Sequence, residues 1–466
     1  MDDEWSGTVV KLLIRGRKRY RIKLYTSEPE KKKIRKVLHE GVLVEILSKL
    51  PAKSVLRFRR VSKEWYALTK TSYFIARHDL HRRSRSAQNH DLLLFSTYLT
   101  NEKSDRLLMM SLHPDDKKSK ILPTSFLPIS KQITLSRSKH LHFGCVGSSN
   151  GLVCCLLLPI ENENEKENST TAEVEEEEEG DVEEKDAAPA PAPAHTDILV
   201  VWNPATEEFR YLPQPPINPF EKEEGIGIGI QRDLRNYVLG FDFLPEISQY
   251  KVVRVFPAPH PGNDPDSEDD ADRKIAIFQA QVLLQSTNSW RDVKDKLEFP
   301  SFKSTCRTCD AITLNGVMYW LVEQTSSEFY LVSFNLRDEV FHLIPLPIEW
   351  RRLNEDQYCL HPWNGSAAIL TSYSENGDWE RVLWVLVQDQ ESKKPAWVQQ
   401  FRTRSKVFSE LRCVGAWKDQ YIVSKRSRNS LFAYDPRSDT KIKLFPHRDK
   451  ICFSGGLDYV ESLLPV

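Results

Sequence analysis

The residues with the clearest capacity for chemistry form a serine motif. Residues 147–151 (Gly-Ser-Ser-Asn-Gly) fit the G-x-S-x-G pattern, in which Ser149 would be the nucleophile of a hydrolase. That chemistry needs a strand, a sharp turn and then a helix. The residues that follow, Leu152 to Leu156, are apolar and favour a strand. The pattern therefore predicts a polar turn that leads into a strand, and not a catalytic elbow.

Two other motifs are weaker. Cys306 and Cys309 form one Cys-x-x-Cys pair, and Cys359 with His361 could complete four zinc ligands. These two lie about 50 residues further on, unlike the short-range ligand pairs of structural zinc sites. The glycine-rich stretch 225–229 lacks the lysine of a phosphate loop and the spacing of a dinucleotide fingerprint. No catalytic residue, metal site or cofactor is expected.

Composition and charge narrow the class of protein. The chain has 466 residues, with 65 Lys and Arg against 66 Asp and Glu. This length suits two or three domains, and the balance of charge argues against a protein that coats nucleic acid or membrane. No apolar run approaches the roughly 20 residues of a membrane span, and the acidic start is unlike a secretory signal. Eight irregularly spaced cysteines favour a reduced compartment, so we expect a cytoplasmic and/or nuclear protein.

Three stretches lack the pattern of a folded core. Residues 1–36 include a basic run and are predicted to be a largely disordered arm, with a nuclear-import signal or nucleic-acid patch as alternatives. Residues 161–195 are acidic and then alternate Ala with Pro, and residues 263–272 are acidic again. Neither stretch can bury enough apolar surface to offset the entropy of ordering, so both are predicted to be disordered insertions.

A helical pattern is confined to about residues 40–80. Apolar residues at 42, 43, 46, 47 and 50 follow helical spacing, and Pro51 ends that helix. A second apolar set runs from Val55 to Val61, and a third begins around Trp65. Three such helices bury little surface, so we expect a partner to cover some of their apolar side chains.

After residue 90 the pattern predicts an all-β region. Its unit is an apolar strand, a tight polar turn and an alternating strand that ends near a proline. The unit spans residues 200–213, 282–293, 332–345 and 432–444, and more faintly 383–398. A repeat of about 50 residues is the period of propeller blades.

The expected propeller has about six blades, with seven as the alternative. The late strand around Cys452 is expected to pair with the early strand Leu92 to Phe95 and so close the ring. Closure would remove the edges that invite aggregation.

Two segments resemble known families. Residues 37–65 strongly resemble an F-box, from Val37-Leu38-His39 through Leu50-Pro51 to Trp65. The β region is similar to the kelch-like, F-box-associated domain of the large plant F-box family, through residues 146–154, 202–206, 250–254, 288–292 and 315–320. The joint resemblance implies a multidomain chain: a small all-α, three-helix F-box at 37–80, a linker at 81–90 and an all-β propeller at 91–466.

The resemblance implies a non-catalytic receptor subunit of an SCF-type (Skp–cullin–F-box) ubiquitin ligase. The F-box would bind a Skp-type adaptor, and through it cullin and RING subunits, while the propeller would hold an unknown target protein. The residues that match the apolar and aromatic positions of the F-box are Leu43, Ile46, Leu47, Leu50, Pro51, Val55, Leu56, Val61 and Trp65. Some of them must form the core of the small bundle. Such a receptor acts by proximity, because it holds a target lysine near the charged conjugating enzyme.

Two other functions stay open at this point. In one, the propeller binds carbohydrate or a small ligand and the F-box serves only the protein's own turnover. In the other, which is the less favoured, the basic arm binds RNA and its affinity falls steeply with salt.

Overall fold

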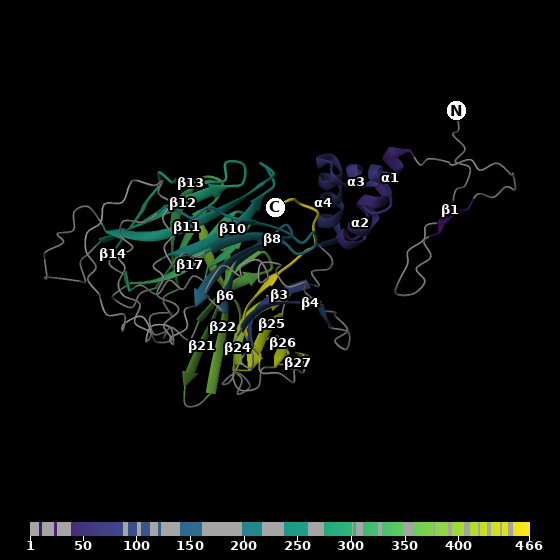
Figure 1. Cartoon of the computed structure of the whole chain (residues 1–466). Helices are drawn as coiled ribbons and strands as arrows, with labels where there is room; N and C mark the ends of the chain where they lie inside the picture. The colour runs from purple at the N-terminus through teal and green to yellow at the C-terminus, as the bar shows by residue number, and fades with distance from the viewer. Residues whose placement is uncertain are drawn as a thin grey trace, which may run out of the picture. The chain divides into compact units, whose positions relative to one another are not determined.

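The structure is a computed structural model that describes residues 9–11, 23–25, 39–86, 92–99, 104–111, 120–122, 140–160, 198–216, 237–259, 275–300, 302–303, 311–324, 329–347, 358–375, 378–389, 394–404, 411–417, 420–425, 430–438, 440–445 and 451–466 (Figure 1). The expected insertions at 161–195 and 263–272 lie outside these residues. Of the basic arm, the structure describes two strands, β1 (Val9–Lys11) and β2 (Lys23–Tyr25), which pair antiparallel. The chain forms two compact units, residues 1–47 and 48–466.

Four helices follow, where three were expected. They are α1 (Glu40–Ser48), α2 (Ala52–Phe58), α3 (Lys63–Lys70) and α4 (Ser72–Ser86). The expected third helix is divided at Thr71, whose backbone is extended with ψ 143°. The Thr71 hydroxyl oxygen accepts a hydrogen bond from the Phe74 backbone N–H at 3.2 Å and so caps the first turn of α4.

The first part of the predicted linker at 81–90 is helical, because α4 continues to Ser86. The polar and basic residues there contain no Gly or Pro to break a helix. Asp79 and Arg82, one turn apart on α4, also form an ion pair. In the described part of the chain, no helix is both long and apolar enough to cross a membrane.

Helices α2 to α4 pack around a few buried side chains. Val55 and Phe74 are fully buried, and Phe74 stacks on the ring of His78. His78 Nε2 lies 2.9 Å from the Leu50 carbonyl oxygen. Ser62 precedes α3 and caps it, because its hydroxyl oxygen accepts from the Trp65 N–H.

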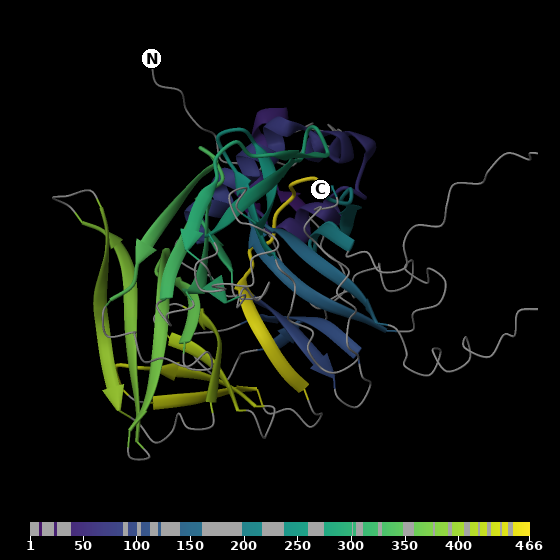
Figure 2. The same ribbon diagram turned by 90° about the vertical axis from the view of Figure 1, so that its left-hand side faces the viewer.

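The β region is a propeller of six sheets, as predicted, and the alternative of seven blades is wrong for the described residues (Figure 2). Blade 1 is β28 (Ile451–Asp458), β3 (Leu92–Leu99), β4 (Ser104–Ser111) and β5 (Lys120–Leu122); blade 2 is β6 (His140–Ser149), β7 (Leu152–Ile160), β8 (Ile198–Asn203) and β9 (Glu208–Tyr211); blade 3 is β10 (Val238–Leu244), β11 (Gln249–Pro259), β12 (Ile275–Leu284), β13 (Ser289–Asp292) and β14 (Leu297–Pro300). Blade 4 is β15 (Phe302–Lys303), β16 (Ile312–Leu314), β17 (Val317–Gln324), β18 (Phe329–Asn335) and β19 (Val340–Pro345); blade 5 is β20 (Tyr358–Trp363), β21 (Ser366–Glu375), β22 (Asp378–Gln388) and β23 (Pro395–Arg404); blade 6 is β24 (Leu411–Trp417), β25 (Gln420–Lys425), β26 (Leu431–Asp435) and β27 (Thr440–Phe445).

The repeated unit of the sequence is the hairpin of the third and fourth strands of a blade. Residues 200–213 form β8 and β9, and the other units form β12 with β13, β18 with β19, β22 with β23, and β26 with β27. In three of these hairpins an Asn or Asp caps the turn: Oδ1 of Asn203, Asn335 and Asp435 accepts from the backbone N–H two residues on. The need for such a capping side chain explains why the sequence is polar at these turns.

A second recurrent turn joins β6 to β7 in blade 2, β16 to β17 in blade 4 and β20 to β21 in blade 5. Each is an Asn-Gly pair in which both residues have positive φ, from 49° to 52° at Asn and from 78° to 82° at Gly. The pairs are Asn150-Gly151, Asn315-Gly316 and Asn364-Gly365. This conformation belongs to the tight type I′ hairpin turn, which Asn-Gly favours.

Each pair of neighbouring blades buries its own apolar cluster. Leu93 and Phe95 of β3 pack with blade 6, while Leu94, between them, packs with blade 2. The same alternation on β7 sends Val153 toward blade 1 and Cys154 toward blade 3. Because successive side chains of a strand point to opposite faces, each blade is apolar on both faces. Six clusters fill the six interfaces, so the ring is complete.

The two ends of the β region close the ring. Strand β28 pairs antiparallel with β3, with Ile451 opposite Leu99 and Asp458 opposite Leu93. Both views show the yellow C-terminal strand beside the blue strand of blade 1 (Figures 1 and 2). The predicted closure is confirmed. Gly456 lies at an irregularity in this pairing, where an added Cβ would lie 2.6 Å from Phe95 Cε1.

Gly456→Ala should lower the free energy of unfolding by about 1–3 kcal/mol, because the new methyl group would overpack the closing strand pair. Gly144→Ala is the matched control, since its Cβ would lie 3.8 Å from Leu156 Cβ, an ordinary contact. Urea unfolding of the full chain measures both. Equal stability of the two variants would contradict the close contact at the seam.

Candidate functional site

The nine predicted adaptor-binding residues differ in exposure. Leu47 and Val55 are fully buried and so belong to the core of the helices. Pro51 is exposed, and Val61 is 60% exposed. The others are half-buried: Leu43, Ile46, Leu50, Leu56 and Trp65. The structure thus separates residues that stabilise the helices from residues that are free to meet a partner, which the sequence alone leaves open.

Four exposed apolar side chains of the helices were not predicted as site residues. Val42 on α1 is 46% exposed, Tyr66 on α3 is 47%, and Tyr73 and Leu80 on α4 are 67% and 56%. Large apolar side chains exposed on so short a segment are the kind of residue that interaction sites use. The sequence offered one sign that Tyr73 is exposed, which is its neighbour Phe74. Consecutive side chains on a helix point about 100° apart, so when Phe74 is buried Tyr73 points away from the core.

Trp65 lies between these two groups. It is half-buried, and its ring meets Phe58 edge-on with centroids 5.7 Å apart. Edge-to-face pairs of this kind stabilise packing beyond the area they bury. Trp65 therefore supports the packing of α2 against α3 and keeps part of its surface exposed.

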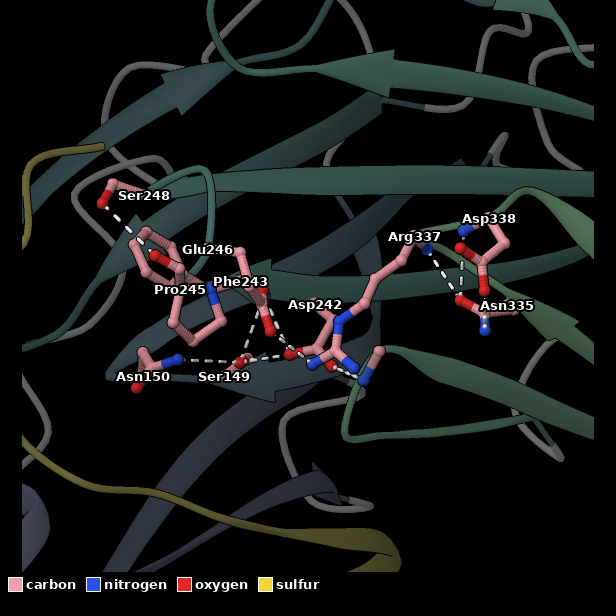
Figure 3. Close-up of polar contacts among 11 residues, drawn as sticks. Ser149, Asn150, Asp242, Phe243, Pro245, Glu246, Ser248, Asn335, Arg337 and Asp338 are labelled. Atoms are coloured by element: carbon pink, nitrogen blue, oxygen red, sulfur yellow. Dashed lines mark hydrogen bonds and ion pairs between the residues drawn. The ribbon is translucent and has the colours of Figure 1, made fainter.

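The serine motif forms a turn between strands. Ser149 ends β6, Asn150 and Gly151 make the turn, and Leu152 begins β7. The sequence-based prediction is confirmed, because no helix follows the serine. Figure 3 shows the Ser149 hydroxyl donating to Asp242 Oδ1, while its oxygen accepts from the Phe243 backbone N–H at 3.2 Å.

Asp242 is the centre of this network. Its carboxylate links three blades. Asp242 lies on β10 of blade 3, accepts from Ser149 on β6 of blade 2, and through Oδ2 accepts from the Gly316 N–H of blade 4 at 2.6 Å (Figure 3). Burial raises the pKa of the Asp242 carboxyl, and these hydrogen bonds and the charge of Arg337 oppose that effect. Ser149 is thus engaged by Asp242 and by the Phe243 backbone, and the network ties strands of blades 2, 3 and 4 together.

Asp242→Asn should lower the free energy of unfolding by about 1–3 kcal/mol. Each carboxylate oxygen of Asp242 accepts from a backbone N–H, so the new amide NH₂ would face a donor in either orientation. Thermal or urea unfolding measures the change. Asp338→Asn, at an exposed carboxylate, is the control. Unchanged stability of Asp242→Asn would show that the network is dispensable.

The cysteines give no metal site among the described residues. Five of them are thiols, and no group of three His, Cys, Asp or Glu side chains in the described part could hold a metal ion. A hydrogen bond with Cys413 and burial raise the pKa of the Cys359 thiol. His361 packs against Tyr421, with ring centroids 5.1 Å apart. Cys306 and Cys309 lie outside the described residues.

A small crevice lies between blades 4 and 5. Its volume is about 290 Å³, and its lining is Leu314, Asn315, Val317, Tyr319, Gly365, Ser366, Ala367, Leu386, Val387, Gln388 and Pro395. One of its polar groups is already engaged, because Asn315 Nδ2 donates to the Gly365 carbonyl oxygen at 3.2 Å. The crevice is slightly smaller than the roughly 300–1,000 Å³ usual for small-molecule sites.

Comparison with known families decides the identity of the two parts. The family model of the F-box domain matches residues 38–77, and that of the F-box associated beta propeller domain matches residues 96–440. The chain is an F-box protein of the F-box associated propeller family. The resemblance found in the sequence is thereby confirmed, as is the order of helical F-box and six-bladed propeller.

Several relatives of this F-box protein come from the plant Arabidopsis thaliana. It is 25% identical to "Putative F-box protein At1g47790" of Arabidopsis thaliana over 354 residues, or 75% of this chain and 68% of the relative. It is 24% identical to "F-box protein At5g49610" of the same plant over 67% of this chain and 65% of the relative. "F-box/LRR-repeat protein At2g43260" is 23% identical over 91% and 82%. The chain thus spans about two thirds of the length of the first two.

Solved structures give only distant likeness to this F-box protein. A chain of the "Crystal structure of Nidogen/Laminin Complex" aligns with a TM-score of 0.34 and 9% identity, over 80% of this chain and 99% of that one. A putative 6-phosphogluconolactonase from Bacteroides uniformis aligns with a TM-score of 0.33 and 10% identity, over 78% and 98%. Nothing about this chain follows from likeness at that level.

Proposed function

We propose that this F-box protein is the substrate receptor of an SCF-type ubiquitin ligase. The observation that carries the proposal is the set of exposed apolar side chains on F-box helices that precede a closed propeller. The helices would bind a Skp-type adaptor, which links to cullin and RING subunits. The propeller would hold a target protein. We expect it to act in the cytoplasm, the nucleus or both.

The exposed residues would form the adaptor contact. Val61, Tyr66, Tyr73 and Leu80 are each between 47% and 67% exposed, so their burial by a partner would remove a large apolar area from water. Aromatic side chains at the centre of an interface carry much of its binding energy. Leu47 and Val55, which were predicted to contact the adaptor, would instead hold the helices in place.

The proposed receptor performs no covalent chemistry. Ser149 is committed to a structural hydrogen bond, and the described thiols with a resolved shift have raised pKa values. A thiol with a raised pKa is a poor nucleophile, because the thiolate is the reactive form. The receptor would contribute effective concentration by holding a target lysine beside the conjugating enzyme.

Val61→Asp and Tyr73→Ala should each weaken binding of a purified Skp-type adaptor by about tenfold or more, which corresponds to about 1.4 kcal/mol. Their stability should not change, because both side chains are mostly exposed. Calorimetric titration of the full chain measures the affinity. Trp65→Ala should differ from both, with a loss of stability on the order of 3 kcal/mol.

Val398→Asp is the control for Val61→Asp. Val398 lies on β23 of the propeller and is 42% exposed, so the same change there should leave adaptor binding intact. Full adaptor binding by Val61→Asp and Tyr73→Ala together would place the contact elsewhere. A parent protein that binds no adaptor isoform would sink the proposed function.

A further inference from the structure

The last helix of the F-box touches the propeller through Arg82. The guanidinium is fixed on α4 by Asp79, which accepts from both Nε and Nη2 of Arg82. From there Nη2 donates to Asn150 Oδ1 at 2.8 Å, in the β6–β7 turn of blade 2. The side chains of Arg82 and Asp79 are only 10% and 15% exposed. A charge-assisted hydrogen bond shielded from water in this way is stronger than one at an exposed surface.

The turn that receives Arg82 is itself held by the ring. Asn150 Nδ2 lies 3.5 Å from the Ser149 hydroxyl, which donates to Asp242, and Asp242 in turn accepts from the Gly316 N–H (Figure 3). This series of contacts leads from the helix to blades 2, 3 and 4. The Arg82 contact therefore rests on a part of the propeller that is fixed by three blades.

The C-terminal tail, Tyr459–Val466, follows β28 and crosses blade 2. Asn203, which is fully buried at the end of β8, donates from Nδ2 to the carbonyl oxygens of Ser462 at 3.3 Å and Leu464 at 2.8 Å. Leu463 is buried, and Leu464 and Val466 pack on the apolar cluster between blades 2 and 3. The tail is not part of any strand, but it is bound to blade 2 and to the cluster between blades 2 and 3.

The tail also meets both the turn and a second helix. An added Cβ at Gly151 would lie 2.5 Å from the Val460 carbonyl oxygen, so the tail lies directly on the β6–β7 turn. On the helical side, Glu461 forms an ion pair with Lys53 of α2 at 2.9 Å, and the Glu461 side chain is 19% exposed.

We propose that the C-terminal tail and Arg82 form a clamp that fixes helices α2 and α4 on blade 2. Arg82, Asn203 and Glu461 are then positioning residues, which bind neither adaptor nor target. On the proposed function, which this consequence rests on, the clamp sets where a target held by the propeller lies relative to the ligase. A receptor with a loose clamp would bind both partners and present the target in many orientations.

Asn203 permits a precise test because its two roles use different atoms. Its Oδ1 caps the β8–β9 turn, as Asn335 and Asp435 do in blades 4 and 6. Of its two side-chain polar atoms, Nδ2 is the one that donates to the tail. Asn203→Asp keeps the acceptor for the turn and replaces the donor with an oxygen that faces two carbonyl groups. Asp435 shows that an aspartate suits such a turn.

Asn335→Asp is the matched control. The turn is of the same kind, and among the described residues the Asn335 Nδ2 donates within its own turn, to Asp338 Oδ2. Arg82→Gln loosens the clamp from the helical side and leaves the apolar core unchanged. It therefore tests the proposal even if Asn203→Asp folds poorly.

The experiment measures the distance between helix and propeller in the full chain without adaptor. Spin labels on noncanonical residues at Lys70 of α3 and Gln399 of β23, both exposed, report that distance by pulsed electron resonance. The parent should give one narrow distribution of distances. Asn203→Asp and Arg82→Gln should each broaden it, and the double variant should lose the narrow peak altogether. Asn335→Asp should keep it.

A narrow distribution in the double variant, or equal broadening in Asn335→Asp, would overturn the clamp. Titration of a Skp-type adaptor onto the same proteins separates this result from the proposed function. The clamp variants should bind the adaptor like the parent, because Val61, Tyr66 and Tyr73 are unchanged. Failure of the parent to bind adaptor would defeat the proposed function, while the distances would still decide whether the clamp exists.

Discussion

The fold depends on the two apolar faces of each blade. A strand such as β7 carries Val153 and Cys154 side by side, and these residues enter different clusters on opposite sides of the sheet. A sheet of this kind is unstable alone, because both of its faces would be in contact with water. Only a closed ring satisfies every blade. Each interface is thus stabilised on condition that all the others form, which gives the β region one cooperative core.

Ring closure makes the C-terminal strand indispensable and also determines what comes after it. Once β28 is paired with β3, the chain emerges at blade 1 and its last eight residues have a built surface within reach on blade 2. The last F-box helix leads into the other strand of this closing pair, since α4 ends at Ser86 and β3 begins at Leu92. The pairing of β28 with β3 therefore brings the C-terminal tail near the end of α4, and the contacts of Arg82 and Glu461 use that proximity.

The sequence predicted those features of the fold that are set by local patterns of residues. Alternating apolar runs and polar turns gave the strands, their hairpins and the number of blades, because turn chemistry and strand period are local properties. The break between α3 and α4 was missed, since Thr71 acts through a cap geometry that ordinary helix residues also allow. The extension of α4 to Ser86 was missed because a polar, basic run resembles a solvated linker, although nothing in it ends a helix.

Most of the site could not be predicted, because its contacts join residues far apart in the chain. Ser149 meets Asp242, and Asn203 meets Leu464, over separations of 93 and 261 residues. One sequence also cannot tell an apolar residue of a small bundle from one at its surface. Leu47 and Val61 both matched the F-box pattern, yet one is buried and the other is 60% exposed. Only their packing separates the two roles.

The place where the pairing of blade 2 strands stops has a bearing on how propellers of this family diversify. Strands β7 and β8 are paired as far as Leu157 and Ile198, and the chain between them leaves from the end of the sheet opposite the Asn150-Gly151 turn. Insertions or deletions there would alter the outline of one rim and leave the helix-bearing rim unaltered. A lineage could therefore lengthen, shorten or recharge that segment while keeping the contacts that Arg82 and Glu461 make at the other rim.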